Sequence, residues 1–168
     1  AFIPSLADAL RWGGIHYRVG GPDKPSALRH AVDVLPLPPE VDREFLLEVL
    51  LARESVGSTA IGDGIAIPHI RNPVTLHVPR PLVALCFLEN RIDFQAIDGE
   101  PVQTWFLIVS PTIKAHLSLL SKLAYGLHAT EFKAVVAARA SRDEIHQEVG
   151  RFGAALASTA GHAECAST

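Results

Sequence analysis

Two short, almost uninterrupted apolar segments constrain the fold of this chain most strongly. They are Leu82–Leu88 (LVALCFL) and Thr104–Ser110 (TWFLIVS), and a third run of this kind covers Ile65–Ile70. Strands that are apolar without alternation lie in sheets covered on both faces. The sequence therefore predicts a central sheet between two other layers, in a chain whose 168 residues fit one ordinary domain.

Helical patterns before and after these segments predict the covering layers. Asp23-Lys24-Pro25 is typical of a helix start, and a second helix is expected from about Glu40 to about Glu54. A third helix opens at Ser110-Pro111-Thr112. Its expected buried stripe is Ile113, Leu117, Leu120, Ala124 and Leu127. Because the strands and helices do not alternate regularly, we expect an α/β fold with a mixed central β-sheet flanked by helices on both faces.

The ends of the chain differ in composition from its middle. Residues 1–25 are interrupted by glycines and prolines around a short predicted strand, Ile15–Val19, and we expect an N-terminal extension or a linker from an upstream region. Residues 151–168 are rich in Ala, Gly and Ser, as in a flexible tail. Residues 26–150 are then the expected domain.

Charge and hydropathy exclude several classes of function. The net charge is -3 without a basic block, so we expect this segment not to bind nucleic acid. No apolar run approaches the roughly 20 residues of a membrane span, and the N-terminus lacks the basic region of a signal peptide. Cys86 lies in an apolar run and Cys165 in the tail, so no framework disulfide is expected between them. We expect a cytoplasmic protein that does not insert into a membrane.

The segment from Gly57 to Ile70 (GSTAIGDGIAIPHI) places glycines before a Pro-His pair. Glycine permits close backbone approach, Pro68 stiffens the chain before His69, and Ser58 and Thr59 can donate hydrogen bonds to an anion. Such a pocket suits a phosphoryl group on an imidazole, and its expected members are Gly57, Ser58, Thr59, Gly64 and Pro68. A glycine-rich turn with a histidine at a strand end fits equally well. On the predicted helices His30, His128 and His146 are expected to be solvated.

Four segments together resemble a known family. Ala52–His69 (ARESVGSTAIGDGIAIPH) resembles the signature of enzyme IIA domains of the mannitol/fructose and nitrogen-regulatory type, from the bacterial phosphoenolpyruvate-dependent phosphotransferase system. Leu82–Leu88, Ile92–Val102 and Phe106–Leu117 resemble the segments that follow in this family, in the same order. The resemblance covers roughly residues 26–149.

The resemblance implies a role for three residues. His69 corresponds to the histidine that accepts a phosphoryl group from a small histidine phosphocarrier protein, His116 to the second active-site histidine, and Arg53 to the arginine of the family's Arg-Glu pair. A neutral imidazole is a nucleophile, and a guanidinium holds phosphoryl oxygens with a fixed fork. Neither a cofactor nor a metal is expected. Ile70 departs from the small residue common in the family, and its size could narrow the access of partners.

Several hypotheses of function follow. The resemblance favours a regulatory phosphocarrier, which would act as a phosphotransferase if active and bind regulatory target proteins. One alternative is a sugar-transport domain that passes the phosphoryl group to an enzyme IIB domain, and another is a binding module that is not phosphorylated. A metal-dependent enzyme built on His69, His116 and Asp98 is a third possibility, although no H-x-x-x-H or C-x-x-C spacing supports it.

Overall fold

The computed structural model describes residues 4–70 and 78–165. Within these ranges five strands form one sheet in the order β1-β4-β5-β3-β2. The strands are β1 (Ile15–Val19), β2 (Ala60–Gly62), β3 (Ile65–Ala66), β4 (Leu82–Ile92) and β5 (Val102–Val109). The pairs β1/β4 and β3/β5 are parallel, whereas β4/β5 and β2/β3 are antiparallel. The predicted mixed sheet is confirmed.

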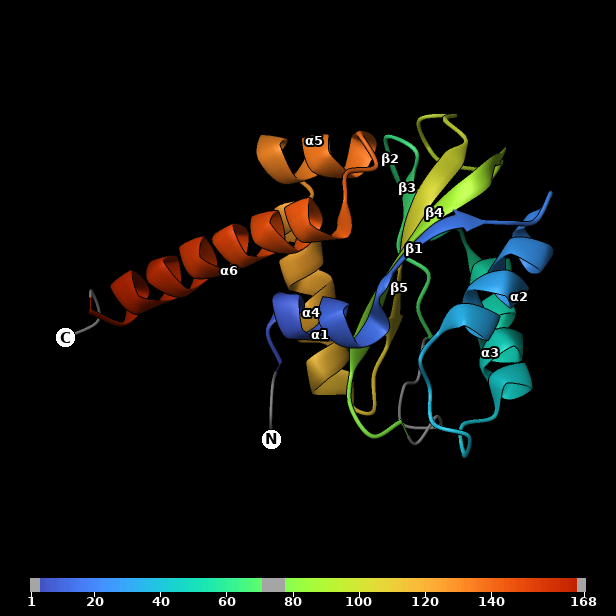
Figure 1. Cartoon of the computed structure of the whole chain (residues 1–168), viewed down its shortest axis with the longest axis horizontal. Helices are drawn as coiled ribbons and strands as arrows, with labels where there is room; N and C mark the ends of the chain where they lie inside the picture. Colours follow the sequence, from blue (N-terminus) through green and yellow to red (C-terminus); the bar gives the residue numbers. More distant parts are fainter. Residues whose placement is uncertain (1–3, 71–77, 166–168) are drawn as a thin grey trace.

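Helices cover both faces of this sheet, as predicted (Figure 1). Those on one side are α2 (Lys24–Val34) and α3 (Arg43–Val56), and those on the other are α1 (Leu6–Gly13), α4 (Ile113–Gly126), α5 (Thr130–Ala137) and α6 (Arg142–Cys165). The side chains of β5 alternate between two hydrophobic clusters. Trp105 and Leu107 pack with the α2 and α3 residues, and Phe106 and Ile108 with those of α1 and α4. This alternation explains why the strand is apolar throughout.

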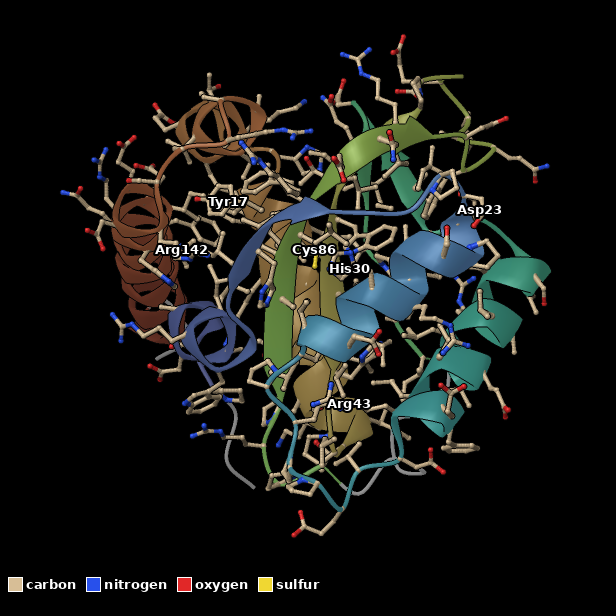
Figure 2. All side chains as sticks on the ribbon, turned by 45° about the vertical axis from the view of Figure 1, so that its right-hand side comes forward. Tyr17, Asp23, His30, Arg43, Cys86 and Arg142 are labelled. Carbon is tan, nitrogen blue, oxygen red and sulfur yellow. The ribbon has the colours of Figure 1, made fainter. Side chains whose placement is uncertain are left out.

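Local sequence signals fix where the helices begin. Asp23 caps α2 by accepting a hydrogen bond from the backbone N of Ser26, and the Ser26 hydroxyl completes a capping box (Figure 2 labels Asp23). Asp42 caps α3 in the same way, so this helix starts at Arg43 rather than near Glu40.

The predicted buried stripe of α4 is wrong at three of its five positions, Ile113, Leu117 and Ala124, which are exposed. Ile113 and Leu117 are 53% and 57% exposed. The buried residues of α4 are Ala115, His116, Leu119, Leu123 and Gly126. Both sets follow helical spacing, so periodicity alone could not choose between them. The rotation that the structure adopts turns His116 toward the sheet and leaves two large apolar side chains in contact with solvent.

Helix α2 crosses the first expected domain boundary, after residue 25, and helix α6 crosses the second, after residue 150. Helix α1 and strand β1 lie within residues 1–25, and Ile15 of β1 pairs with Leu85 of β4, so part of the expected extension is built into the sheet. Helix α6 continues past residue 150 as far as Cys165. The division of the chain into domains remains a prediction. Within the described ranges, no helix has both the length and the apolar character to cross a membrane.

Candidate functional site

His69 lies at the end of the extended segment that follows β3. This segment runs beside β5, because the backbone N of Ile108 donates to the carbonyl of Pro68 at 3.1 Å and His69 forms an isolated bridge with Ile108. The ring Nδ1 of His69 is 2.7 Å from the carbonyl oxygen of Ile67. A carbonyl only accepts hydrogen bonds, so Nδ1 carries a proton, and in the neutral ring Nε2 keeps its lone pair. The backbone therefore selects the nitrogen that can act as a nucleophile.

His116 comes from the first turns of α4 and faces His69. Thr112 caps this helix, accepting from the backbone N of Ala115 with its hydroxyl and from that of His116 with its carbonyl. The two imidazole rings have centroids 5.2 Å apart and are tilted by 41°. Burial, and to a smaller extent His69, lower the pKa of His116 to about 4. His116 is therefore neutral near pH 7.

The two nitrogens of His116 differ in their surroundings. Its Nδ1 is buried and has no hydrogen-bond partner among the described residues. Leaving an N–H donor buried without a partner is costly, so the favoured tautomer places the proton on Nε2. A His116 in this form can donate one hydrogen bond, from Nε2.

Arg53 lies in the last turn of α3, at the entrance to the glycine-rich segment. Its Nη1 donates to the carbonyl of Gly57 at 2.7 Å, and both residues line a shallow pocket with Val56 and Ser58. The Gly57 backbone is extended, with φ of 171°, and a Cβ atom there would meet nothing. Any residue could adopt this backbone conformation, so φ does not require glycine at position 57, and its place in the phosphoryl pocket remains a prediction.

Ser58 and Thr59 run antiparallel to the segment that carries His69. The carbonyl of Thr59 accepts from the backbone N of Ile67 at 3.0 Å, and continuing this register puts Ser58 opposite Pro68. The expected donors of Thr59 are used within the protein, whereas the Ser58 hydroxyl acts as an acceptor and its O–H group can still donate. Both the backbone N and the hydroxyl of Thr59 donate to Glu54, and the Ser58 hydroxyl accepts from the backbone N of Ala60.

Gly64 and Asp98 lie at the other end of this hairpin. Gly64 has φ of +74° in the turn between β2 and β3, where glycine is favoured. His69 follows five positions later along an extended chain, which is roughly 16 Å at about 3.3 Å per residue. Asp98 accepts a hydrogen bond from the backbone N of Asp63 in the same turn. The structure thus brings neither residue to the histidine pair, and the described residues contain no cluster of His, Cys, Asp and Glu side chains that could hold a metal.

Ile70 points away from the site. Its side chain is 2% exposed and packs in the cluster on the α2 and α3 side, whereas Ile65 and Ile67 pack on the α4 side with His69 directed the same way. Successive side chains of an extended chain face opposite sides, which accounts for this arrangement. Ile70 does not narrow the access to His69.

The remaining helical histidines divide into two environments. His30 is exposed on α2, where its Nδ1 accepts from the backbone N of Gly20 at 2.7 Å (Figure 2). His146 is half-buried rather than fully solvated, and its Nδ1 is buried without a partner in the described part of the chain. Burial, and next the charge of Arg11, lower its pKa.

Sequence reasoning missed Glu54. The side chain of this residue is 3% exposed and contacts Lys24 and Thr59. It occupies the inward face of α3, at helical spacing from Leu47 and Leu50. That spacing was the available signal, but a glutamate at the end of an amphipathic helix is usually solvated.

Comparison with known proteins identifies relatives over most of the chain. A family model described as "Phosphoenolpyruvate-dependent sugar phosphotransferase system, EIIA 2" matches residues 13–150. The chain is 34% identical over 113 residues to a nitrogen regulatory protein of Pseudomonas aeruginosa, covering 66% of this chain and 71% of that protein. It is 35% identical over 106 residues to the fructose-specific EIIABC component of a Bacillus subtilis PTS system, covering 62% of this chain but 16% of that protein.

Solved structures share the fold. The nitrogen regulatory protein IIA-Ntr from Neisseria meningitidis superimposes with a TM-score of 0.73 at 27% identity, over 86% of this chain and 98% of that one. The structure of a complex of enzyme IIAMTL and phosphorylated enzyme IIBMTL from Escherichia coli matches with a TM-score of 0.60 at 20% identity, over 80% of this chain and 93% of that one. The second likeness supports the fold alone.

Proposed function

This chain belongs to the EIIA 2 family of the phosphoenolpyruvate-dependent sugar phosphotransferase system, and on that basis we propose that it is a phosphocarrier whose acceptor atom is Nε2 of His69. The donor is a small histidine phosphocarrier protein. The observation that carries the proposal is the hydrogen bond from Nδ1 of His69 to the Ile67 carbonyl, which leaves Nε2 unprotonated.

The transfer step is a displacement at phosphorus. The Nε2 lone pair of His69 forms a bond to phosphorus, and the phosphorus–nitrogen bond of the donor breaks, with its electron pair returning to the donor imidazole. The ring of His69 then carries positive charge on its Nδ1–H group. The Ile67 carbonyl accepts from this N–H and stabilises that charge. No oxidant, metal or external base is needed.

Two further side chains, His116 and Arg53, donate hydrogen bonds to the oxygens of the transferred phosphoryl group. A neutral His116, 5.2 Å from His69 between ring centroids, donates a hydrogen bond from Nε2 to a phosphoryl oxygen. Arg53 now caps the end of α3 through the Gly57 carbonyl, so it exchanges this contact for phosphoryl oxygens when the group arrives. Phosphoryl transfer depends mainly on such positioning and charge stabilisation.

The regulatory version of this function is the one we favour. The similarity to a nitrogen regulatory protein over 71% of that protein supports it. In this version the protein binds regulatory targets differently in its phosphorylated and unphosphorylated states. A sugar-transport version, in which an enzyme IIB domain takes the phosphoryl group, is supported by the similarity to a fructose-specific component.

One experiment tests acceptance and separates these versions. The chain is incubated with phosphoenolpyruvate, enzyme I and the histidine phosphocarrier protein of its own organism, and its intact mass is measured. An acid-labile adduct on the wild type but not on His69→Ala supports the phosphocarrier. Rapid loss of the adduct to an added fructose-type IIB domain supports the transport version. Equal labelling of His69→Ala contradicts the assignment, and no labelling of either leaves a binding module of the same fold.

A further inference from the structure

The buried face of α3 ends in a carboxylate. Glu54 follows Leu47 and Leu50 on this face, and its side chain is only 3% exposed. A carboxylate in such a place is unfavourable unless donors replace the water that it has lost. The neighbouring Arg53 points the other way, toward Gly57 and solvent.

Three donors compensate Glu54. The Lys24 ammonium lies 3.0 Å from Oε2, and it also sits over the Phe94 ring at 4.2 Å from the centroid. The backbone N of Thr59 donates to Oε2 at 3.4 Å, and the Thr59 hydroxyl donates to Oε1. Two of the three donors thus come from one residue of the glycine-rich segment.

Thr59 links this carboxylate to the acceptor histidine. Its carbonyl accepts from the backbone N of Ile67 at 3.0 Å, and the carbonyl of the same Ile67 accepts from Nδ1 of His69 at 2.7 Å. Thr59 is itself 6% exposed, so few other contacts with solvent compete for its groups. Glu54 is therefore joined to the ring of His69 through two intervening residues.

We propose that Glu54 is a positioning residue for His69. By holding Thr59, which binds the backbone N of Ile67, it fixes the backbone of this residue, and the carbonyl of Ile67 then keeps the proton of His69 on Nδ1 and leaves Nε2 as the nucleophile. The consequence for phosphoryl transfer rests on the proposed function, whereas the tautomer of His69 does not. A merely structural carboxylate that closes the end of α3 would affect stability and leave the tautomer of the folded protein unchanged.

The test compares variants that interrupt the hydrogen-bonded connection from Glu54 to His69 at two residues, Glu54 and Thr59. Glu54→Gln keeps the shape of the side chain but replaces the carboxylate beside Lys24 by a neutral amide with one acceptor oxygen. Thr59→Val removes the hydroxyl at nearly constant volume, and Thr59→Ser restores it. The matched control is Glu44→Gln, because Glu44 lies on the same helix but is exposed and paired with Arg29. Far-UV circular dichroism and thermal unfolding identify the variants that fold.

The main readout is the tautomer of His69. It is measured by long-range proton–nitrogen NMR at about pH 8.5, above the ordinary histidine pKa of about 6.5. We expect the Nδ1–H form in the wild type, Glu44→Gln and Thr59→Ser, and a mixture of both tautomers in Glu54→Gln and Thr59→Val. The rate of phosphoryl acceptance should fall about tenfold or more in the last two.

Each outcome decides between the two roles. Folded Glu54→Gln or Thr59→Val protein with the wild-type tautomer overturns the proposal, as does a wild type that carries its proton on Nε2. If Glu54→Gln does not fold, Thr59→Val alone decides. A shift of the tautomer in proteins that accept no phosphoryl group, the wild type included, would support the positioning role while contradicting the proposed function.

Discussion

The imidazoles of His69 and His116 lie with their centroids 5.2 Å apart, and the deeper burial of His116 lowers its pKa to about 4. A neutral His116 does not repel the positive charge that develops on the ring of His69 during transfer. It also remains able to donate one hydrogen bond to the phosphoryl group. In the proposed function, His69 is therefore the nucleophile and His116 the neutral hydrogen-bond donor.

Replacing His116 should slow transfer without unfolding the protein. We expect His116→Ala to reduce the rate of phosphoryl acceptance by about 100-fold, the loss typical of removing one hydrogen-bond donor from a transition state. Rapid-quench measurement of labelled protein gives this rate. The control is His128→Ala, since His128 is exposed beyond the end of α4. An unchanged rate in folded His116→Ala would assign His116 a structural role only.

The burial of His116 should also make stability depend on pH. Its folded pKa lies near 4, below the unfolded value of about 6.5, so the unfolded state binds more protons between these values. This contribution to stability is complete above about pH 6.5 and is lost as the pH falls toward 4, by at most about 1.4 kcal/mol per pH unit.

Urea unfolding of the wild type and His116→Gln at about pH 7 and pH 5 checks this expectation. The wild type should lose more stability than the variant across this interval. Identical losses would mean that His116 titrates normally in the folded protein. His146 has a lowered pKa as well, so His146→Gln serves as a parallel variant.

The planar guanidinium of Arg53, with its paired N–H donors, should contribute to the rate of phosphoryl transfer as well as its charge. Arg53→Lys keeps a cation but cannot present two parallel N–H donors to phosphoryl oxygens. We expect transfer about tenfold slower, with a phosphorylated form that hydrolyses at a different rate. Time courses of mass spectra give both quantities. Full activity of Arg53→Ala would show that this arginine only caps α3 through Gly57.

Ile70 should act on stability and not on access. Because its side chain is buried in the core, Ile70→Ala should destabilise the protein by about 2–5 kcal/mol. The rate of phosphoryl acceptance by the folded fraction should stay close to that of the wild type. Faster acceptance without a loss of stability would mean that Ile70 lies in the path of the partner. Urea unfolding and rapid-quench assays measure the two effects.

Much of the fold follows from signals that act locally or along one strand. The apolar runs in β4 and β5 predicted burial on both faces, and Asp23 with Pro25 marked the start of α2. The phase of α4 could not be predicted in this way, because two stripes share the same spacing and the packing against the sheet selects the one that contains His116.

The site was predictable only in part. A Pro-His pair after glycines pointed to His69, but the sequence does not show which polar groups satisfy one another. Thr59 was expected to donate hydrogen bonds to a bound phosphoryl group, and it donates them to the carboxylate of Glu54 instead. Gly64 was assigned to the pocket from its proximity in sequence, although an extended segment carries it to the far end of the hairpin. Both differences concern contacts that only the tertiary structure defines, and the membership of the phosphoryl pocket remains a prediction.

The most direct test of the central claim is to find the atom that carries the phosphoryl group. The protein is labelled with ¹⁵N-histidine and phosphorylated by phosphoenolpyruvate, enzyme I and the histidine phosphocarrier protein, and nitrogen and phosphorus NMR spectra are recorded. We predict one phosphohistidine, with phosphorus bonded to Nε2 of His69 and the proton retained on Nδ1. A phosphoryl group on Nδ1 of His69, on another histidine, or on none in the presence of active donor proteins would contradict the account.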